Sequence, residues 1–305
     1  MGKKRILITG GTGSLGSFLV SRWYATHTLT VVSRNPHKQA ELARSFPNVN
    51  FVLTDICNAG EMERACRDQD ILIHAAALKQ VDIGEAHPVE YARVNIFGTI
   101  TVMEAWKATH IGNNNGKALF IATDKAASPL NCYGRCKGVA TDIWRKYGGS
   151  VIRYGNVVES RGSFFQLWKI ALAEKQPLVV RTPEPTRFFL TLDDAAELVE
   201  DALDVMDGIG GIFAPHSLSA FSVHDVAKYL NNIYSTGIIE EPLGNYEKID
   251  EVLLALGEGP KAVSNLLSVV TPTWGVDKAT MDRFCSRTAP RMTAAEVLER
   301  GKWML

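Results

Sequence analysis

Short apolar runs alternate with amphipathic stretches through the first half of the chain. Apolar side chains recur at Leu15, Phe18, Leu19 and Trp23, which is the spacing of one face of a helix. The runs between such stretches are apolar enough for burial on both faces, which is typical of strands in a parallel sheet. These predicted strands are Arg5–Thr9, Leu29–Ser33, Val49–Leu53, Ile71–Ala75, Ala118–Thr123 and Val151–Tyr154.

Several positions mark the expected starts of helices. Pro36 and Pro88 stand where proline is favoured, in the first turn of a helix. Asp193 is expected to cap a helix with an apolar stripe, and Ser222 with Asp225 forms a capping signature before another. The chain beyond these helices is richer in glycine and proline, and the pattern assigns no elements there.

The alternation of strands and helices indicates an α/β fold of the Rossmann type, built on a doubly wound parallel sheet. The regularity weakens in the second half of the chain. We therefore expect a dinucleotide-binding domain over residues 1–160 and a smaller, mainly substrate-binding C-terminal domain over residues 161–305. Segments at about 186–230 are expected to pack back on the first domain.

Composition narrows the classes of partner. The chain has 305 residues, of which 46% are hydrophobic, and this is enough for a full core. Lys and Arg together number 33, as do Asp and Glu, so the formal net charge is zero. A chain without a basic excess is not drawn to nucleic acid or to an acidic membrane face. No apolar run approaches the roughly 18 to 20 residues of a membrane span, so no membrane partner is expected.

Cysteine and histidine usage gives two further expectations. The five cysteines are odd in number and form no Cys-x-x-Cys pair, and the N-terminus has no signal-peptide pattern. These features favour a reducing compartment, and we expect a cytoplasmic location. The seven histidines form no His-Glu-x-x-His sequence or Cys/His cluster, so no metal site is expected.

A glycine-rich segment joins the first predicted strand to the first predicted helix. Glycines at this place allow a tight turn and a close approach of backbone N–H groups to a pyrophosphate, which then faces the N-terminus of the helix. Ordinary turns also use glycine, but the position between a strand and an amphipathic helix favours dinucleotide binding. The expected binding residues are Gly10, Thr12, Gly13, Ser14, Leu15 and Gly16.

The end of the second predicted strand favours NADP over NAD. NAD-binding versions of the fold usually carry an acidic residue there, whereas this chain has Ser33 and Arg34, with Lys38 one helical turn later. A guanidinium can hold a ribose 2′-phosphate through charge-assisted hydrogen bonds. Solvated surface charges are the alternative for Arg34 and Lys38. Asp55 and Ile56 are expected near the adenine, with a simple turn as the alternative for Asp55.

Two short sequences carry candidate chemistry. Tyr133 and Lys137 form Tyr-x-x-x-Lys, which places both side chains on one face of a helix. A lysine ammonium and a cationic nicotinamide would lower the tyrosine pKa from its usual value of about 10. Thr123, Asp124 and Lys125 end the preceding strand, at the sheet edge where ligands bind. An acid beside an amine suits an elimination, although such a pair can also simply cap a strand.

Further motifs surround these residues. They are His74-Ala-Ala-Ala-Leu-Lys79, Thr123-Asp-Lys-Ala-Ala-Ser-Pro129, Asn131-Cys-Tyr-Gly134, Arg153-Tyr-Gly-Asn-Val-Val158, Ser160-Arg-Gly-Ser163 and Thr186-Arg-Phe188. With the glycine loop and Tyr-x-x-x-Lys, they resemble the extended short-chain dehydrogenases/reductases. Within that family the sequence is most similar to the inverting UDP-N-acetylglucosamine 4,6-dehydratases of polysaccharide biosynthesis, over roughly residues 5–230.

The resemblance implies dehydration of UDP-N-acetylglucosamine or a related UDP-sugar, through a transient 4-ketone and a recycled NADP. Tyr133 would take the proton of the sugar 4-hydroxyl, with Thr123 bound to the 4-oxygen and Lys137 holding the nicotinamide ribose. Lys125 would be the base at carbon 5, and Asp124 the acid that helps the 6-hydroxyl leave. Reprotonation from the opposite face would invert carbon 5. Relatives self-associate, so a homo-oligomer is also implied.

The family pattern also implies contacts to substrate and cofactor. The small residues Ala75, Ala76 and Ala77 would let the cofactor lie close over the backbone. Lys79 would lie near the substrate, with a surface lysine as the alternative. The candidates for the substrate diphosphate are Asn156, Arg161 and Arg187.

Three departures from the family pattern fall on the substrate side. The family carries Arg-Pro-Gly-Glu-Lys where this chain has Glu241–Lys248 without an arginine. Glu159 replaces a small glycine, and residues 80–82 replace His-Val-Pro. The reaction type is therefore better supported than the identity of the sugar.

Two rival functions share the same scaffold. A nucleotide-sugar epimerase would use Tyr133 and the cofactor without loss of water, and the Asp124–Lys125 pair argues against it. A non-catalytic dinucleotide sensor would normally lack the tyrosine or the lysine, and this chain keeps both.

Overall fold

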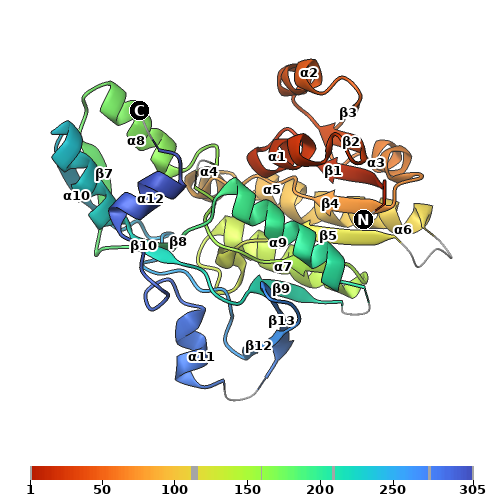
Figure 1. The fold of residues 1–305 in the computed structure, drawn as a ribbon. Coiled ribbons are helices and arrows are strands. Elements are labelled where there is room, and N and C mark those ends of the chain that lie inside the picture. The colour runs from red at the N-terminus through yellow and green to blue at the C-terminus, as the bar shows by residue number, and fades with distance from the viewer. Residues whose placement is uncertain (1, 111–115, 159, 208–209, 274–275, 304–305) are drawn as a thin grey trace.

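The computed structural model describes residues 2–110, 116–158, 160–207, 210–273 and 276–303. A nine-stranded sheet forms the centre of the molecule, in the order β12-β13-β9-β6-β5-β4-β1-β2-β3 (Figure 1). Its strands are β1 (Arg5–Thr9), β2 (Thr28–Ser33), β3 (Asn50–Leu53), β4 (Ile71–His74), β5 (Lys117–Ile121), β6 (Ser150–Ile152), β9 (Ile212–Pro215), β12 (Glu258–Ala262) and β13 (Leu267–Pro272).

The described helices follow the strands along the chain. In the first half they are α1 (Ser14–Trp23), α2 (Pro36–Ser45), α3 (Ala59–Cys66), α4 (Val81–Ala86), α5 (Pro88–Ala92), the π-helix η1 (Arg93–Phe97), α6 (Gly98–Thr109), the 3₁₀ turn η2 (Asp124–Ala126) and α7 (Cys132–Lys146). In the second half they are α8 (Phe164–Ala173), α9 (Leu192–Val205), α10 (Val223–Tyr234), α11 (Lys278–Arg283) and α12 (Ala294–Arg300).

The strand order confirms the predicted Rossmann-type sheet. Strands β3 to β9 are parallel, and β13 and β12 add an antiparallel edge. Strand β1 lies between β2 and β4, with Ile8 opposite Val31 on one side and Ile73 on the other. The order reverses between β1 and β4, and this is the point where such sheets bind ligands.

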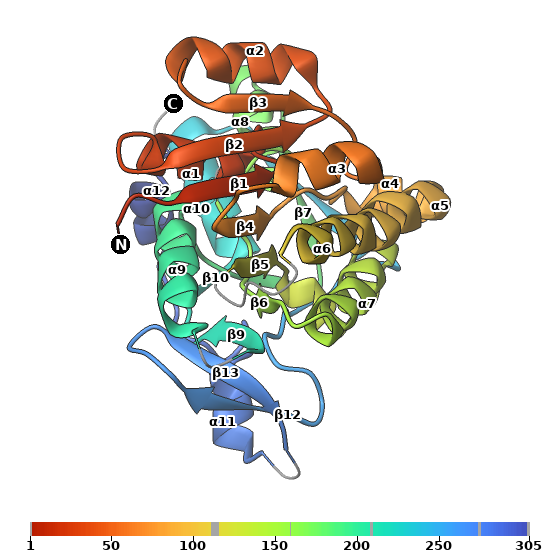
Figure 2. The ribbon, with the colours of Figure 1, turned by 90° about the vertical axis from the view of Figure 1, so that its right-hand side faces the viewer.

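Helices cover both faces of the sheet, as Figure 2 shows for α3, α6 and α7 on one side and α9 on the other. Successive side chains of β1 point to opposite faces, so Leu7 joins one core and Ile6 and Ile8 the other. Helices α6 and α7 add Trp106 and Trp144 to the first core. Full burial of an aliphatic side chain such as Leu7 or Ile8 stabilises the fold by about 1.5–3 kcal/mol, so both layers stabilise the sheet.

A third apolar cluster lies in the second half of the chain. It joins α8, α10 and α12 to two small sheets, in which β7 (Leu178–Thr182) pairs with β11 (Ile238–Pro242) and β8 (Thr186–Phe188) pairs with β10 (Ala220–Ser222). Helix α9 packs on α1, and β9, β13 and β12 extend the main sheet. The second half of the chain therefore contributes both to the main sheet and its covering helices and to the third cluster. A domain boundary at residue 160 stays a prediction.

The predicted elements agree with the structure within two residues at each strand end. Pro36 and Pro88 begin α2 and α5, and Ser222 caps α10 by accepting the N–H of Asp225. The predicted cap at Asp193 is wrong. Thr191 caps α9, because its hydroxyl and the carboxylate of residue 194 satisfy each other's backbone N–H groups in a capping box. In the described part of the chain, no helix combines the length and apolarity needed to cross a membrane.

Candidate active site

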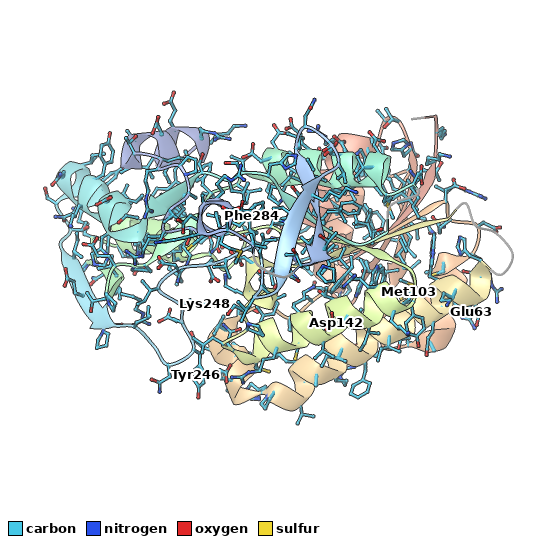
Figure 3. All side chains as sticks on the ribbon, turned by 90° about the horizontal axis from the view of Figure 1, so that it is seen from below. Glu63, Met103, Asp142, Tyr246, Lys248 and Phe284 are labelled. Carbon is cyan, nitrogen blue, oxygen red and sulfur yellow. The ribbon has the colours of Figure 1, made fainter. Side chains whose placement is uncertain are left out.

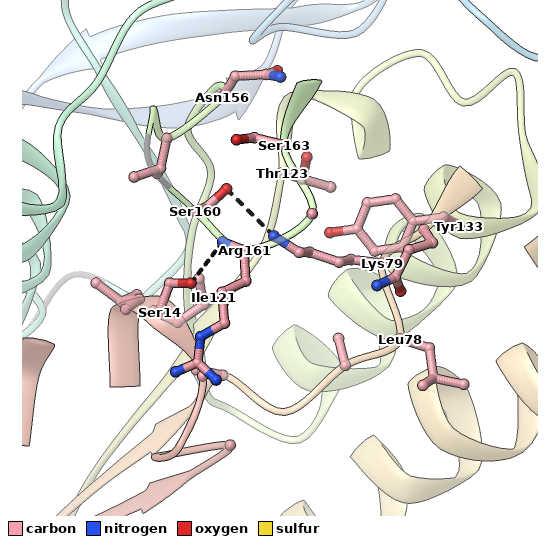
Figure 4. A pocket seen from close by; sticks show the side chains of 18 of the residues that line it. Ser14, Leu78, Lys79, Ile121, Thr123, Tyr133, Asn156, Ser160, Arg161 and Ser163 are labelled. Carbon is pink, nitrogen blue, oxygen red and sulfur yellow. Dashed lines mark hydrogen bonds between the residues drawn. The ribbon is translucent and has the colours of Figure 1, made fainter. Parts of the chain in front are cut away.

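Two adjoining cavities lie at the carboxyl ends of the central strands, and Figure 4 shows side chains that line the larger one. The larger, of about 640 Å³, is lined by the predicted residues Gly10, Gly13, Ser14, Leu15, Gly16, Lys38, Ala75, Ala77, Lys79, Thr123, Lys125, Tyr133, Lys137, Asn156 and Arg161. The smaller, of about 310 Å³, adds Thr12, Ser33, Arg34, Asp55, Ile56 and Ala76. Only Asp124 and Arg187 among the predicted site residues line neither cavity, and Asp124 accepts hydrogen bonds from two residues that do.

The glycine loop has a conformation that only glycine adopts without strain. Gly10 has φ +70°, and a Cβ there would lie 2.7 Å from the Cα of Ala76. The N–H of Gly10 donates to the carbonyl of Val32 over 2.8 Å, which fixes the turn against β2. The space above the loop therefore admits a ligand close to the backbone, as a dinucleotide pyrophosphate requires.

The smaller cavity contains groups suited to an adenosine ribose and its phosphate. The hydroxyl oxygen of Ser33 is buried and has no hydrogen-bond partner. The guanidinium of Arg34 lies 3.6 Å from Asp55 and 3.7 Å from Glu90, and Arg93 holds the same two carboxylates more closely. The unpartnered hydroxyl and the loosely held guanidinium fit a 2′-phosphate. Sequence reasoning missed Glu90 and Arg93, which follow no motif.

Lys79 and Arg161 are two of the cations that line the larger cavity. The backbone N–H of Arg161 donates to the hydroxyl of Ser14 over 2.9 Å, and its guanidinium donates to the carbonyl of Thr12 over 2.8 Å. The ammonium of Lys79 donates to the hydroxyl of Ser160 over 3.3 Å (Figure 4). Burial and the charge of Arg161 lower the pKa of Lys79. Arg161, predicted to bind the substrate diphosphate, therefore lies against the cofactor loop.

The turn after β5 carries the predicted acid and base. The hydroxyl of Thr123 donates to Oδ1 of Asp124 over 2.9 Å, and the ammonium of Lys125 donates to the same oxygen over 3.2 Å. The Lys125 ammonium also donates to Asn156 over 3.2 Å. Asp124 is fully buried, and its second oxygen has no partner. Burial raises the pKa of Asp124, as an acid requires.

Close packing brings Tyr133 to this turn. Asn131 caps α7 by accepting the N–H of Gly134 over 2.8 Å. A Cβ at Gly134 would lie 2.5 Å from the carbonyl oxygen of Lys125, so only glycine lets the helix approach so near. Tyr133 and Lys125 then line the same cavity, as the sequence predicted.

The charges around Tyr133 differ from those expected. Burial raises the pKa of Tyr133 to about 12, and the positive charge of Lys125 only partly opposes this. The side chain of Lys137 is buried, donates to the carbonyl of Ile121 over 2.8 Å and lies 4.1 Å from the centroid of the Phe120 ring. Burial lowers the pKa of Lys137 to about 7. Within the chain itself, the expected fall in the pKa of Tyr133 is therefore not found.

A loop from the C-terminal half, residues 246–251, contacts the turn after β5. The Lys125 ammonium lies 3.0 Å from Glu251, whose other oxygen lies 3.2 Å from Lys248. Arg187 donates to the carbonyls of Lys248 and Ile249, both over 3.0 Å. The guanidinium predicted to bind the diphosphate thus holds this loop. Glu251 carries no motif, and only the spacing of three residues from Lys248 hinted at a pair.

The same loop is tied to the start of α7. The side-chain amide of Asn131 donates to the carbonyl of Tyr246 over 3.0 Å. Figure 3 labels Tyr246 and Lys248 in this loop. The cap of the helix that carries Tyr133 is therefore connected to the loop that carries Glu251.

Comparison with known proteins places this geometry in a family. The family profile described as "Polysaccharide biosynthesis protein" matches residues 6–271. The chain belongs to the polysaccharide biosynthesis protein family. The match spans the glycine loop, the turn after β5, α7 and the loop with Glu251, and it confirms the resemblance predicted from the motifs.

Individual members of this family and solved structures are similar over most of the chain. An inverting UDP-N-acetylglucosamine 4,6-dehydratase from Campylobacter jejuni is 34% identical over 270 residues, covering 83% of this chain and 78% of that protein. A UDP-glucose 4-epimerase from Rickettsia bellii is 33% identical over 250 residues, covering 76% and 72%. The X-ray structure of Pen from Bacillus thuringiensis is 26% identical, covers 98% of both chains and has a TM-score of 0.84.

The three departures from the family pattern lie in different parts of the structure. Glu159 lies outside the described residues. Gln80 lines the larger cavity, and its carbonyl accepts a hydrogen bond from the hydroxyl of Tyr91 over 2.5 Å. Glu241 and Glu247, in the stretch without the family arginine, both pair with Arg181. Among the described residues, no three His, Cys, Asp or Glu side chains are grouped to hold a metal ion.

Proposed function

We propose that this protein is a nucleotide-sugar 4,6-dehydratase that uses NADP and inverts carbon 5 of UDP-N-acetylglucosamine or a related UDP-sugar. One observation carries the proposal: Tyr133 and the Lys125 ammonium line one cavity with the glycine loop, and Asp124 lies directly behind them. An oxidation followed by an elimination needs this combination of groups at one sugar ring. The 34% identity to an inverting dehydratase supports it.

The cofactor site is proposed to span both cavities. The loop at Gly10 would hold the pyrophosphate, and Ser33, Arg34 and Lys38 would hold the 2′-phosphate of NADP. Asp55 and Ile56 would border the adenine, and the alanines after β4 would lie under the nicotinamide half. When bound, the cofactor accepts a hydride from the sugar and later returns one, so it is not consumed.

The reacting groups have separate roles. Tyr133 would take the proton of the sugar 4-hydroxyl, while Thr123 hydrogen-bonds the 4-oxygen and Lys137 holds the nicotinamide ribose. The 4-ketone acidifies the proton at carbon 5, and Lys125 would remove it. Asp124 would supply the proton with which the 6-hydroxyl leaves as water. Asp124 has no surface in the cavity, so its proton would pass through Thr123 or Lys125, the two cavity-lining groups that donate hydrogen bonds to it.

The protonation of Lys125 sets a condition on this mechanism. Burial alone would lower its pKa, but Asp124 and Glu251 raise the pKa of Lys125 above its usual value. The group is therefore an ammonium at rest. It becomes a base after its proton moves along the 3.2 Å hydrogen bond to Asp124.

The sugar is proposed to lie against the part of the cavity formed by the second half of the chain. Asn156 lines this part, Lys79 from the first half reaches it through its hydrogen bond to Ser160, and Arg187 holds the loop that carries Glu251. The division into a cofactor domain and a mainly substrate-binding domain belongs to this proposal. Arg161 lies in the segment 160–163 and the Lys79 ammonium donates to Ser160, so both cations would be available to the diphosphates of the two ligands.

Incubation with UDP-N-acetylglucosamine in deuterated water tests the proposal. A dehydratase gives a product that has lost one water and carries one deuterium at carbon 5, as mass spectrometry and NMR detect. An epimerase, the activity named for the relative from Rickettsia bellii, gives a product of unchanged mass. A product of unchanged mass with altered configuration at carbon 4 would show that the protein is an epimerase and would contradict the proposed dehydration.

Replacement of Tyr133 by Phe separates an enzyme from a cofactor-binding protein. The variant should lose at least a hundredfold in turnover, because general acid–base groups contribute about 10²–10⁴ in rate. Its affinity for NADPH should stay within about twofold. Full activity in Tyr133→Phe would remove the phenol from the mechanism.

Two features of the wider proposal concern the cell. All five cysteines are free thiols, which supports a cytoplasmic enzyme. We further propose a homo-oligomer, by analogy with family members. Sedimentation of the purified protein tests this directly.

A further inference from the structure

The Lys125 ammonium lies between two buried carboxylates from distant parts of the chain. Oδ1 of Asp124 is 3.2 Å away on one side, and Oε1 of Glu251 is 3.0 Å away on the other. Asp124 is 0% exposed and Glu251 2%. Lys125 itself lines the cavity, and its ammonium also donates to Asn156, which lines the same cavity.

The two carboxylates have unequal surroundings. Glu251 also pairs with Lys248 over 3.2 Å and lies within the field of Arg187. Asp124 accepts from Thr123 and Lys125 on one oxygen, and the second oxygen of each carboxylate is buried without a hydrogen bond. Burial alone would raise the pKa of Glu251, but the three cations hold it below its usual value. The pKa of Asp124 is raised by burial and by the negative charge of Glu251.

The backbone fixes Glu251 in this position. Its N–H donates to the hydroxyl of Ser286, and its carbonyl accepts the N–H of Ser286, both over 2.8 Å. Ser286 is fully buried and also bonds Thr186 at the start of β8. Two residues further on, the carbonyl of Leu253 accepts from the buried guanidinium of Arg153 over 2.9 Å. Such anchoring on both sides is typical of a support for a functional group.

We propose that Glu251 is a positioning residue of the acid–base pair: it stays ionised, holds Lys125 in place, and so leaves Asp124 as the carboxylate that takes the proton of Lys125 and then supplies it for the loss of the 6-hydroxyl. This inference rests on the proposed function. In the step concerned, an N–H bond of Lys125 breaks and an O–H bond of Asp124 forms. No electrons are transferred, and the net charge of the group is unchanged. The result is a neutral amine beside a carboxylic acid.

The first test measures Lys125 without substrate or cofactor. Only a neutral amine reacts with acetic anhydride, so the acetylation rate of Lys125, followed by peptide mass spectrometry across pH, reports its protonation. The charged and titratable groups that surround Lys125 are Asp124, Glu251, Lys248, Arg187, Lys79 and Tyr133. Glu251→Gln removes one negative neighbour of Lys125 and should lower the pKa of Lys125. Acetylation of Lys125 at neutral pH should then be faster by about tenfold for each unit by which this pKa falls.

Matched variants make the readout specific. Glu251→Asp keeps the charge and should restore much of the slow acetylation. Lys248→Met removes the other lysine that pairs with Glu251, so the negative charge of Glu251 should act more strongly on Lys125. Acetylation of Lys125 should then be slower than in the wild type, whereas Glu251→Gln makes it faster. Glu184→Gln neutralises an exposed carboxylate, paired with Lys228 over 3.5 Å, and should change nothing. Unfolding curves check that each variant folds. If Glu251→Gln does not fold, the acetylation rate of Lys125 in Lys248→Met still tests the inference.

The second test uses turnover. In Glu251→Gln the oxidation at carbon 4 should persist while the elimination slows, because Lys125 loses its support and Asp124 loses a negative neighbour that raises its pKa. Reduced cofactor, detected by its absorbance, should therefore accumulate, and carbon 5 should exchange slowly with deuterium. A purely structural role would slow both steps equally. Equal acetylation of Lys125 in wild type and Glu251→Gln overturns the inference. Failure of the wild type to release water overturns the proposed function instead, and the acetylation result still decides the role of Glu251.

Discussion

The guanidinium of Arg161 donates a hydrogen bond to the carbonyl of Thr12 over 2.8 Å, so the segment after β6 lies across the glycine loop. The backbone N–H of Arg161 reinforces this contact through Ser14. We propose that a cation held at this place would bind the pyrophosphate of a dinucleotide. The contact with the substrate diphosphate, expected from the sequence, stays a prediction.

Arg161→Ala should weaken NADPH binding by about tenfold, equivalent to about 1.4 kcal/mol, because a hydrogen-bonded charge near the pyrophosphate is lost. Fluorescence titration measures this. Arg67→Ala is the control, since its side chain is exposed and pairs only with Glu63 among the described residues. An unchanged affinity for NADPH, with a raised KM for the UDP-sugar, would indicate that Arg161 binds the substrate and not the cofactor.

Arg34→Ala should raise the dissociation constant of NADPH ten- to a hundredfold and leave that of NADH unchanged. The physical reason is the loss of charge-assisted hydrogen bonds to the 2′-phosphate, which NADH lacks. Parallel titrations with both cofactors measure the ratio. Equal affinities of the wild type for NADPH and NADH would contradict the proposed NADP preference.

Gly10→Ala should destabilise the fold by about 1–3 kcal/mol, because residue 10 has a positive φ and the new Cβ would lie 2.7 Å from Ala76. Urea unfolding measures the change. Gly60→Ala is the matched control in α3, where the nearest atom to a new Cβ is 3.9 Å away. It should be neutral or stabilise by up to about 1 kcal/mol. Equal effects at both positions would show that the loop tolerates a side chain.

Stability should depend on pH through Lys137, whose pKa burial lowers to about 7. In the unfolded chain this pKa is about 10.4, so between these values the unfolded chain binds more protons than the folded one. The free energy of unfolding therefore gains a positive slope of about 1.4 kcal/mol per pH unit from this group. The penalty for burying the charged lysine is complete below pH 7 and disappears as the pH rises.

Lys137→Met removes that slope. Its stability relative to the wild type should be greatest at or below pH 7 and should fall as the pH rises toward 9, as urea unfolding at several pH values measures. Loss of the hydrogen bond to Ile121 shifts the whole curve and leaves the slope unaffected. Parallel stability curves for the two proteins would show that Lys137 keeps an ordinary pKa.

Sequence patterns determined the sheet, the glycine loop and the groups at 123–125 and 133–137. These features depend on side chains a few positions apart, and strand and helix periodicities place such neighbours on known faces. The end of a parallel strand is also a known place for ligands, which made Thr123 and Lys125 identifiable.

Only the tertiary structure decided where Arg161 and Arg187 point, and that Glu251 reaches Lys125. The same holds for the charge of Lys125 and the raised pKa of Tyr133, because both depend on burial and on carboxylates or cations from other segments. Electrostatic energies fall with distance in space and are indifferent to separation along the chain. Contacts between remote loops follow from the packing of the whole core, and no local pattern contains that information.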